Sequence, residues 1–280
     1  MIADAGSTKT QWCLHTGGGM PQHFDTAGIN PFLERPEQIA AMLGAQLPWH
    51  DAMPHVDRLH YFGAGTASKE KQKILERVLQ GHFKASKTEV GSDLLGAAIG
   101  MCGSNKGMVC VLGTGSASGF YNGKAIKESR PSLGYIAGDE GSGNYMGKRI
   151  LQYYTYGTFD DELKVGFEMR FGDNVRAIVA KLYDEPYPNR YLASFVSLLV
   201  DNRGHYMVEN IVEDCLNDFF QTCVVKYRQS WNYPLHFTGS VAYIFKDVVE
   251  SLCHQYELEL GKVEQNPMDG LSRFFAPKEC

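Results

Sequence analysis

Short apolar runs that end in glycine alternate along this chain with segments of helical periodicity. The run at 59–62 leads into Gly63, and the segment 69–80 then repeats its apolar residues at helical spacing behind a capping serine, Ser68. This alternation of strands and helices is typical of an α/β protein. The pattern predicts strands at 1–4, 10–16, 22–26, 59–62, 108–112, 119–121, 124–127 and 235–237, and helices at 36–47, 69–80, 94–102, 191–200, 206–227, 241–256 and 267–275.

The second part of the chain repeats the order of the first. The opening strand runs into a loop of glycine and hydroxyl residues at 5–10, and the strand 108–112 runs into a similar loop at 113–118. Another strand and a hairpin signal follow in each part, the glycines at 17–19 in the first and Asn122-Gly123 in the second. The simplest organisation is therefore two related halves joined near 104–107.

Composition narrows the class of protein. The chain has 280 residues, of which 44% are hydrophobic and 21% charged, as in an ordinary globular protein. Its net charge of −5 argues against nucleic acid as a partner, because nucleic-acid binding needs a basic face. No apolar run reaches the roughly 18 residues of a membrane span, so no membrane partner is expected. The seven cysteines form no C-x-x-C pair, which predicts free thiols in a reducing cytoplasm.

The first loop has the residues of a phosphate site. Asp4 ends the opening strand, and the candidate phosphate ligands that follow it are Gly6, Ser7, Thr8, Lys9 and Thr10. Glycines let backbone N–H groups approach an anion, hydroxyls donate to it, and a lysine adds charge. Beside phosphate, a carboxylate needs a cation between the two, and Mg²⁺ suits that role. The alternative for this stretch taken alone is a hairpin with a solvated acid and lysine.

Two further loops make the phosphate interpretation more favourable. Gly113, Thr114, Gly115 and Ser116 follow the apolar strand 108–112 and can form a second phosphate clamp, while Gly239 and Ser240 follow the strand 235–237 and can hold a nucleoside. The sequence lacks the G-x-x-x-x-G-K-[ST] of a P-loop. It also lacks the G-x-G-x-x-G fingerprint of dinucleotide-binding proteins, because Ser118 stands where the third glycine should fall. The loops therefore predict binding of a polyphosphate and a nucleoside without either of these two motifs.

The three loops, taken together, resemble a known superfamily. They are similar to the phosphate-1, phosphate-2 and adenosine motifs of the actin–hexokinase–Hsp70 ATPases. Further stretches resemble the N-acetylglucosamine kinase branch of the BadF/BadG/BcrA/BcrD ATPase family. The stretches that carry the resemblance are DAGSTKT at 4–10, GINPF at 28–32, GSDLLGAA at 91–98, LGTGSAS at 112–118, GYIAGDEGSG at 134–143, FTGSVA at 237–242 and PMDGL at 267–271.

This resemblance implies a fold and an activity. The fold would be two ribonuclease-H-like α/β domains, each a mixed five-stranded sheet with flanking helices, around an ATP cleft. The domains would span 1–105, completed by a last helix at 267–280, and 106–266. The activity would be transfer of the ATP γ-phosphoryl group, with Mg²⁺, to the 6-hydroxyl of an amino sugar. The alternative within the superfamily is an ATPase that activates a radical dehydratase through a [4Fe–4S] cluster, although Gly113-Thr114-Gly115-Ser116 is of the kinase type.

The resemblance also assigns roles to residues. Asp93 would be the base that takes the proton of the sugar hydroxyl, Asn30 and Asp139 would bind the sugar with Asp93, and Glu140 would support its loop or the metal. From sequence alone each has a plainer alternative. Asp93 and Asp139 could cap or begin helices, and Asn30 could be a turn residue before Pro31.

The chain departs from the family pattern at two places. Gln11 stands where relatives often carry an acid, and only three residues precede Asp4, so the first strand is short. The first departure puts in doubt a second carboxylate near the metal and leaves Asp4 untouched. The sequence leaves open a homodimer, and it leaves open which sugar is used: N-acetylglucosamine, glucosamine, N-acetylmuramic acid or N-acetylmannosamine.

Overall fold

The computed structural model describes the chain except for residues 7, 17–18, 32–33, 50–54, 67 and 277–280. Ser7, two glycines of the hairpin signal, the last residue of the GINPF stretch and the final residues of the predicted 267–280 helix therefore lie outside the described residues. The chain divides into two compact units, which are unit 1 (Met1–Val109, Tyr121–Lys127 and Asn266–Cys280) and unit 2 (Cys110–Phe120 and Glu128–Gln265). The domain limits at 105, 106 and 267 expected from the sequence remain predictions.

The first sheet, in unit 1, has five strands in the order β3-β2-β1-β4-β5. Strand β1 runs antiparallel to β2 and parallel to β4, and β4 runs parallel to β5, so the sheet is mixed. The C-terminal ends of the parallel strands β1, β4 and β5 therefore lie at the same edge of the sheet. The strands and helices of this unit are β1 (Ile2–Ala5), β2 (Lys9–Leu14), β3 (Gln22–Ala27), α1 (Pro36–Gln46), β4 (Arg58–Gly63), α2 (Lys69–Phe83), β5 (Lys87–Ser92), α3 (Asp93–Cys102) and α13 (Met268–Phe275).

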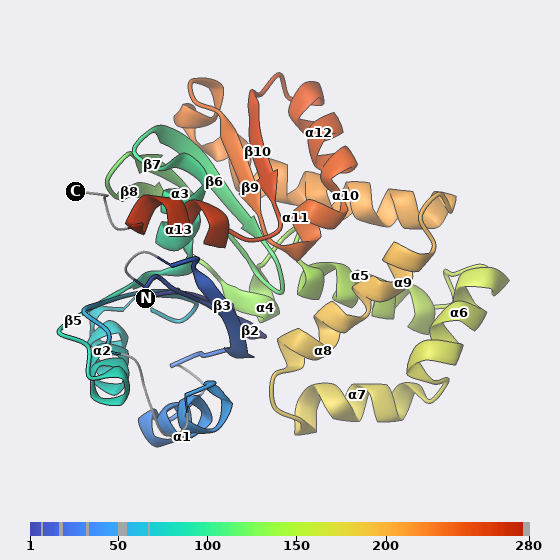
Figure 1. The fold of residues 1–280 in the computed structure, drawn as a ribbon. Helices are drawn as coiled ribbons and strands as arrows, with labels where there is room; N and C mark the ends of the chain where they lie inside the picture. Colours follow the sequence, from blue (N-terminus) through green and yellow to red (C-terminus); the bar gives the residue numbers. More distant parts are fainter. Residues whose placement is uncertain (7, 17–18, 32–33, 50–54, 67, 277–280) are drawn as a thin grey trace. The chain divides into compact units, whose positions relative to one another are not determined.

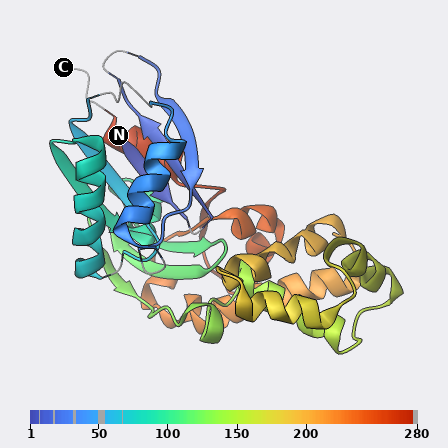
Figure 2. The ribbon, with the colours of Figure 1, turned by 90° about the horizontal axis from the view of Figure 1, so that it is seen from below.

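Helices cover both faces of this sheet. Helices α1 and α2 lie side by side on one face, as Figures 1 and 2 both show. The other face carries α3 and α13, which pack on each other and on β1. Because successive strand residues point to opposite faces, Ala3 and Ala5 of β1 join the core under α1 and α2, and Asp4 faces the α3 and α13 side.

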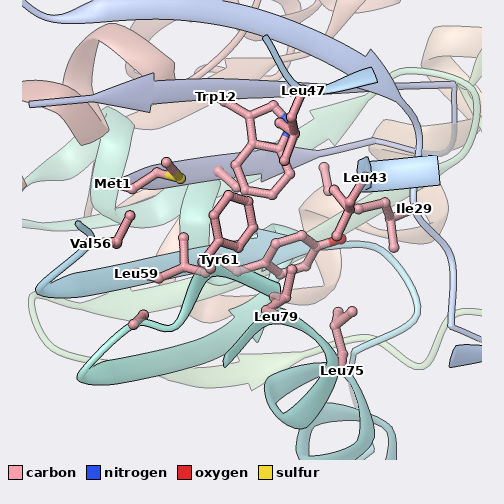
Figure 3. Packing of buried hydrophobic residues seen from close by; sticks show 14 of the residues in the cluster. Met1, Trp12, Ile29, Leu43, Leu47, Val56, Leu59, Tyr61, Leu75 and Leu79 are labelled. Carbon is pink, nitrogen blue, oxygen red and sulfur yellow. The ribbon is translucent and has the colours of Figure 1, made fainter. Parts of the chain in front are cut away.

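Aromatic residues fill the core between the sheet and the helices α1 and α2. Trp12 is fully buried, stacks on Phe24 with ring centroids 6.0 Å apart, and donates from its Nε1 to the Thr26 hydroxyl at 3.0 Å. Figure 3 shows Trp12 and Tyr61 within the same cluster of leucines, with the Tyr61 hydroxyl directed toward Leu43 and Ile29. Burial of such large rings is the main stabilising contribution of a core like this.

The last helix docks on α3 at a pair of glycines. A Cβ on Gly270 would lie 1.8 Å from the Gly100 carbonyl oxygen, and a Cβ on Gly100 would lie 2.5 Å from the Pro267 carbonyl oxygen. Only glycine at both positions permits this backbone approach. The sequence stretch at 267–271 is therefore needed to attach the chain's last helix to unit 1.

The second sheet also has five strands, in the order β10-β9-β6-β7-β8. Strands β9 and β10 are parallel, whereas β6 and β7 are neighbours joined by three residues and form a hairpin. The helices from α5 to α9 gather into one helical group, green to yellow in Figure 2. The remaining elements are β6 (Lys106–Leu112), β7 (Ser116–Asn122), β8 (Ile126–Ser129), α4 (Gly134–Ala137), α5 (Gly143–Thr155), α6 (Asp161–Phe171), α7 (Val175–Asp184), α8 (Pro188–Ser194), α9 (Val196–Asp201), α10 (Tyr206–Thr222), η1 (Val224–Lys226), η2 (Arg228–Trp231), β9 (Leu235–Thr238), α11 (Ser240–Ile244), α12 (Lys246–Gln255) and β10 (Leu260–Glu264).

The predicted fold class is confirmed, since two mixed five-stranded sheets with flanking helices are present. Some element limits were wrong. Helix α2 continues past Gly81 to Phe83, because Phe83 is buried in the unit 1 core. The predicted helix 241–256 is two helices that meet at the fully buried Phe245. Within the described part of the chain, no helix is long and apolar enough to cross a membrane.

Candidate functional site

The turn between β1 and β2 is tight and tied to β3. The Gly6 N–H donates to the Lys9 carbonyl oxygen at 2.9 Å, and the Gly28 N–H donates to the Thr8 carbonyl oxygen at 3.0 Å. Thr10 is fully buried, and its hydroxyl has no hydrogen-bond partner among the described residues. A buried hydroxyl of this kind usually meets an unseen ligand or water. In the sheet register Thr10 pairs with Ala5, so its side chain lies on the α1 and α2 face of the sheet, opposite Asp4.

Lys9 is already engaged within unit 1. Its Nζ lies 2.8 Å from the Asp25 carboxylate on β3, and both side chains are half exposed. An exposed ion pair of this type contributes little to stability and exchanges readily with other partners. The lysine charge is thus available to an anion only in competition with Asp25.

Asp4 and Asp93 lie at the ends of strands β1 and β5, with β4 between them. In the sheet register Asp4 pairs with Phe62, and Phe62 pairs with Gly91, two residues before Asp93. Burial, and then the charge of Asp93, raises the pKa of the Asp4 carboxyl to about 7. The structure thus places two predicted site acids close enough to repel each other, an arrangement that a bound cation would stabilise.

The plain alternative for Asp93, a helix cap, is wrong. The N-cap of α3 is Ser92, whose hydroxyl accepts the Leu95 N–H at 3.2 Å. Asp93 is the first residue of the helix, and its Oδ1 accepts the adjacent Leu94 N–H at 2.8 Å. The second carboxylate oxygen is thus not needed to begin the helix.

The buried Thr66 holds the strand ends from which Asp93 projects. Its hydroxyl lies 2.6 Å from the Gly63 carbonyl oxygen and 2.8 Å from that of Gly91. Phe62 of β4 packs against α3, since a Cβ on Gly96 of that helix would lie 2.5 Å from the Phe62 Cβ. The ends of β4 and β5 and the start of α3 therefore form a rigid support for Asp93. Thr66 was missed from sequence because its role depends on two carbonyls that are distant along the chain.

Asn30 lies in a closed turn with Glu34. The Asn30 N–H donates to Glu34 Oε2 at 3.0 Å, and the Glu34 N–H donates to the Asn30 carbonyl oxygen at 3.0 Å. Lys71 of α2 donates from Nζ to the Pro31 carbonyl oxygen at 2.9 Å. Glu34 and Lys71 were not predicted as site residues. The sequence feature that could have indicated Glu34 is its position four residues after Asn30, with Pro31 between them.

In unit 2 the loop after β6 contacts the acidic turn. The Gly143 N–H donates to the Gly113 carbonyl oxygen at 2.8 Å, and the Asn144 N–H donates to the Thr114 carbonyl oxygen at 3.1 Å. A Cβ on Gly115 would lie 2.9 Å from Asp139 Oδ2, so the Asp139 carboxylate rests directly on that glycine. The structure thus brings the predicted phosphate clamp 113–116 together with Asp139.

Asn144 and Lys148 of α5 also belong to this group, and sequence reasoning missed both. The Asn144 side-chain amide donates to the Thr114 carbonyl oxygen at 2.6 Å and to Asp139 Oδ2 at 2.8 Å. Burial lowers the pKa of Lys148, whereas the charges of Asp139 and Glu140 act in the opposite direction. Lys148 Nζ donates to the Tyr135 carbonyl oxygen at 2.7 Å, so it ties the segment before the acidic turn to the helix after it.

The third predicted loop lies against the second. Gly239 has a φ of +113°, and a Cβ there would lie 2.3 Å from the Leu112 carbonyl oxygen and 3.1 Å from the Gly113 nitrogen. Ser240 begins α11 directly after it. The neighbouring Thr238 hydroxyl is buried and has no hydrogen-bond partner in the described part of the chain. Residues 113–116, 139 and 239–240 thus form one cluster within unit 2.

Each unit by itself offers groups that suit part of a nucleotide or magnesium site. Unit 1 offers the Asp4 carboxylate, whose pKa is raised by burial and then by the charge of Asp93. Unit 2 offers Gly113, beside which there is open space, since a Cβ there would meet nothing within 4 Å. Among the described residues no group of three or more His, Cys, Asp or Glu side chains could hold a metal ion by itself. Mg²⁺ beside phosphates commonly takes one carboxylate and several waters.

Solved structures resemble this chain over nearly its whole length. A Porphyromonas gingivalis structure described as "Putative N-acetylglucosamine Kinase" has a TM-score of 0.92 and 35% identity, and the match covers 98% of this chain and 97% of that one. A Chromobacterium violaceum structure with the same description has a TM-score of 0.75 and 16% identity, with 98% of each chain covered. No family model and no curated protein matched the sequence.

A more distant likeness concerns a structure with ligands. A ROK family glucokinase from Streptomyces griseus, in complex with glucose and AMPPNP, has a TM-score of 0.54 and 15% identity, and the match covers 97% of this chain and 96% of that one. At this identity, as with the Chromobacterium violaceum structure, the likeness shows the fold alone.

Proposed function

The chain belongs to the family of the Porphyromonas gingivalis protein and has the actin-like ATPase fold, and we propose from this that it is an ATP-dependent sugar kinase. The reaction is transfer of the ATP γ-phosphoryl group to the 6-hydroxyl of an amino sugar, with N-acetylglucosamine as the preferred acceptor. The observation that carries the proposal is the coupling of Asp4 and Asp93 at the ends of β1 and β5, on either side of β4, because phosphoryl transfer needs a metal-directed acid and a base.

The nucleotide is assigned to the three glycine and hydroxyl loops. In unit 1, Gly6, Ser7, Thr8, Lys9 and Thr10 bind phosphate oxygens, Lys9 in competition with its ion pair to Asp25. In unit 2, Gly113, Thr114, Gly115 and Ser116 bind phosphate oxygens, and Gly239 and Ser240 contact the nucleoside. The buried Thr238 hydroxyl supports the assignment in unit 2, since none of the described residues supplies it with a hydrogen-bond partner.

Asp4 is assigned to the magnesium ion. The ion would neutralise charge on the β- and γ-phosphates and reduce the repulsion between Asp4 and Asp93. Gln11, which pairs with Asp4 in the sheet register, carries no charge, so this position adds no second carboxylate. The expected ligand set is one protein carboxylate with waters and phosphate oxygens.

The sugar is assigned to Asn30, Asp93 and Asp139. Asp93 accepts the proton of the 6-hydroxyl as the new phosphorus–oxygen bond forms, which is the usual role of a carboxylate in such reactions. Its position at the first turn of α3, free of the capping role that Ser92 fills, supports this assignment. Asn30 and Asp139 hold other polar groups of the sugar, and Glu140 supports the acidic turn.

The dehydratase-activator alternative finds less support. Such a protein holds an iron–sulfur cluster through accessible cysteines. Of the described cysteines all but Cys223 are buried, and burial raises the pKa of Cys215 and Cys253 to about 12, which disfavours thiolates. A purified protein with the visible absorbance of an iron–sulfur cluster would favour this alternative.

Product identification tests the proposal. The protein is incubated with Mg·ATP and N-acetylglucosamine, and the products are examined by phosphorus NMR. ADP and a sugar monophosphate ester should appear in equal amounts, and the phosphorus signal of the ester should couple to the sugar C6 protons. ADP with inorganic phosphate and no sugar ester would overturn the kinase assignment.

A further inference from the structure

Asn144 is a poor choice for a helix and is not needed to begin one. It is the second residue of α5, and asparagine is less favourable in helices than most residues. The N-cap of α5 is Ser142, whose hydroxyl accepts the Tyr145 N–H. The local sequence therefore gives Asn144 no helical role, and the reason for its presence must lie in its tertiary contacts.

Both donors of the Asn144 amide are used, and they point to two different segments. One contact is with the Thr114 carbonyl oxygen at 2.6 Å, and the other is with Asp139 Oδ2 at 2.8 Å. The orientation of the amide is unambiguous, because the flipped form would set its oxygen against two other acceptors. Asn144 is fully buried, so these hydrogen bonds are shielded from water and one of them is charge-assisted.

Asp139 needs such support. Its φ of +62° lies in the left-handed region, which costs a non-glycine residue free energy. On one side its carboxylate rests against Gly115, and it accepts the Asn144 amide. The Gly143 and Asn144 N–H groups add two bonds to the carbonyl oxygens of the same loop. Three hydrogen bonds thus join the segment 139–144 to the loop 113–115, Asn144 supplies two of them, and its amide also holds the Asp139 carboxylate.

We propose that Asn144 is a positioning residue that fixes the Asp139 carboxylate against the loop 113–116. Through this contact the group assigned to the sugar and the loop assigned to phosphate keep one relative geometry. This inference rests on the proposed function, which assigns Asp139 to the sugar. Asn144 itself touches neither substrate in this account, so its effect on sugar binding passes through Asp139.

A double-mutant cycle on sugar affinity tests the inference. The variants are Asn144→Ala, Asp139→Asn and the double variant, and the measurement is N-acetylglucosamine affinity by calorimetry. Asn144→Ala should raise Kd on the order of tenfold, as for loss of a hydrogen bond to a charged group. The double variant should bind no more weakly than Asp139→Asn alone. Additive losses, or an unchanged Kd in Asn144→Ala, would overturn the inference.

Ser142→Ala is the matched control for a merely structural effect. It removes the cap of the same helix two residues away and should lower Tm without raising the sugar Kd. If Asn144→Ala behaves like Ser142→Ala, with a lower Tm and a normal Kd, Asn144 is structural only. If Asp139→Asn leaves Kd unchanged, the assignment of Asp139 to the sugar fails instead.

Amide hydrogen exchange decides the inference without any sugar. In Asn144→Ala, exchange should rise on the order of tenfold both in the peptide covering 112–118 and in the one covering 138–143, because the two segments are no longer fastened. A rise confined to the start of α5 would overturn the inference. Should wild-type protein bind no N-acetylglucosamine, the sugar proposal fails, and the exchange result still decides the role of Asn144.

Discussion

Asp4 and Asp93 are electrostatically coupled across strand β4. Burial raises the pKa of the Asp4 carboxyl to about 7, and the charge of Asp93 adds to this shift. The pKa of Tyr61 is also raised, first by burial and then by the charges of Asp4, Glu34 and Asp93, in that order. The strand-end region of unit 1 therefore collects negative charge around a sheet edge, where a cation would be stabilised.

Replacing Asp93 by asparagine should separate chemistry from folding. Asp93→Asn keeps the shape and the acceptor for the Leu94 N–H but cannot take a proton. Phosphoryl transfer should fall on the order of 10²–10⁴-fold, the usual worth of a positioned base, while sugar and ATP affinities change by only a few-fold. Steady-state kinetics with binding measured by calorimetry is the test.

Ser92→Ala is the control for Asp93. It removes the true cap of α3, which should cost about 1 kcal/mol of stability and leave turnover near that of wild type. A normal kcat in Asp93→Asn would remove Asp93 from the chemistry. A greater loss of turnover in Ser92→Ala than in Asp93→Asn would have the same consequence.

Asp4 should determine the magnesium requirement. Asp4→Asn removes the charge that would bind the ion, so the Mg²⁺ concentration for half-maximal activity should rise on the order of tenfold or more, with sugar affinity nearly unchanged. The measurement is initial rate against free Mg²⁺ at saturating sugar. Asp25→Asn, which changes an exposed acid of the same sheet, is the control, and an equal response in both variants would argue against a special role of Asp4.

Gly239 should tolerate no side chain. Gly239→Ala places a Cβ 2.3 Å from the Leu112 carbonyl oxygen at a φ of +113°, so the loop must move away from Gly113. Affinity for a non-hydrolysable ATP analogue should fall on the order of tenfold or more, and Tm should drop. Gly81→Ala, where a Cβ meets nothing within 4 Å inside α2, should leave ATP affinity unchanged and raise stability slightly.

Local pattern indicated those candidate site residues that lie at strand ends. Asp4 and Gly113 became candidates because an apolar strand followed by a loop of glycine and hydroxyl residues occurs more than once in the chain. Asn144 could not be found, because its function depends on Thr114, a residue 30 positions away, and on the left-handed turn of Asp139. Most strands and helices of unit 1 could likewise be predicted, because they depend on local pattern.

Element limits failed where burial decided them. Gly81 reads as a helix stop, yet α2 continues because Phe83 enters the core beside Trp12, with ring centroids 5.3 Å apart. Strand β10 was not predicted, since only Val263 of its five residues is buried and the strand has no apolar run. Tertiary burial thus overrides local propensity in both directions.

His236 should make stability depend on pH. Burial, with a smaller effect from Lys262, lowers its pKa from 6.5 to about 4, and its Nδ1 accepts the Lys262 N–H at 3.1 Å. Between these pH values the unfolded chain binds a proton that the folded chain does not, so stability falls as pH drops from 6.5 toward 4. The loss should reach about 3 kcal/mol, since a tenfold change in proton affinity corresponds to about 1.4 kcal/mol.

The His236→Asn variant isolates this contribution. Its amide oxygen can replace Nδ1 as the acceptor but does not titrate in this range. Chemical denaturation of both proteins from pH 7 to pH 4 should give a smaller loss of unfolding free energy in the variant. Parallel curves would show that His236 is not the group responsible.

ADP release measured across a panel of sugars distinguishes a sugar kinase from an ATPase that needs no sugar. The panel consists of N-acetylglucosamine, glucosamine, N-acetylmuramic acid, N-acetylmannosamine and glucose, each with Mg·ATP. The account predicts ADP release that depends on sugar, with the highest kcat/KM for N-acetylglucosamine, and none after EDTA is added. ADP release at the same rate with and without every sugar would contradict it.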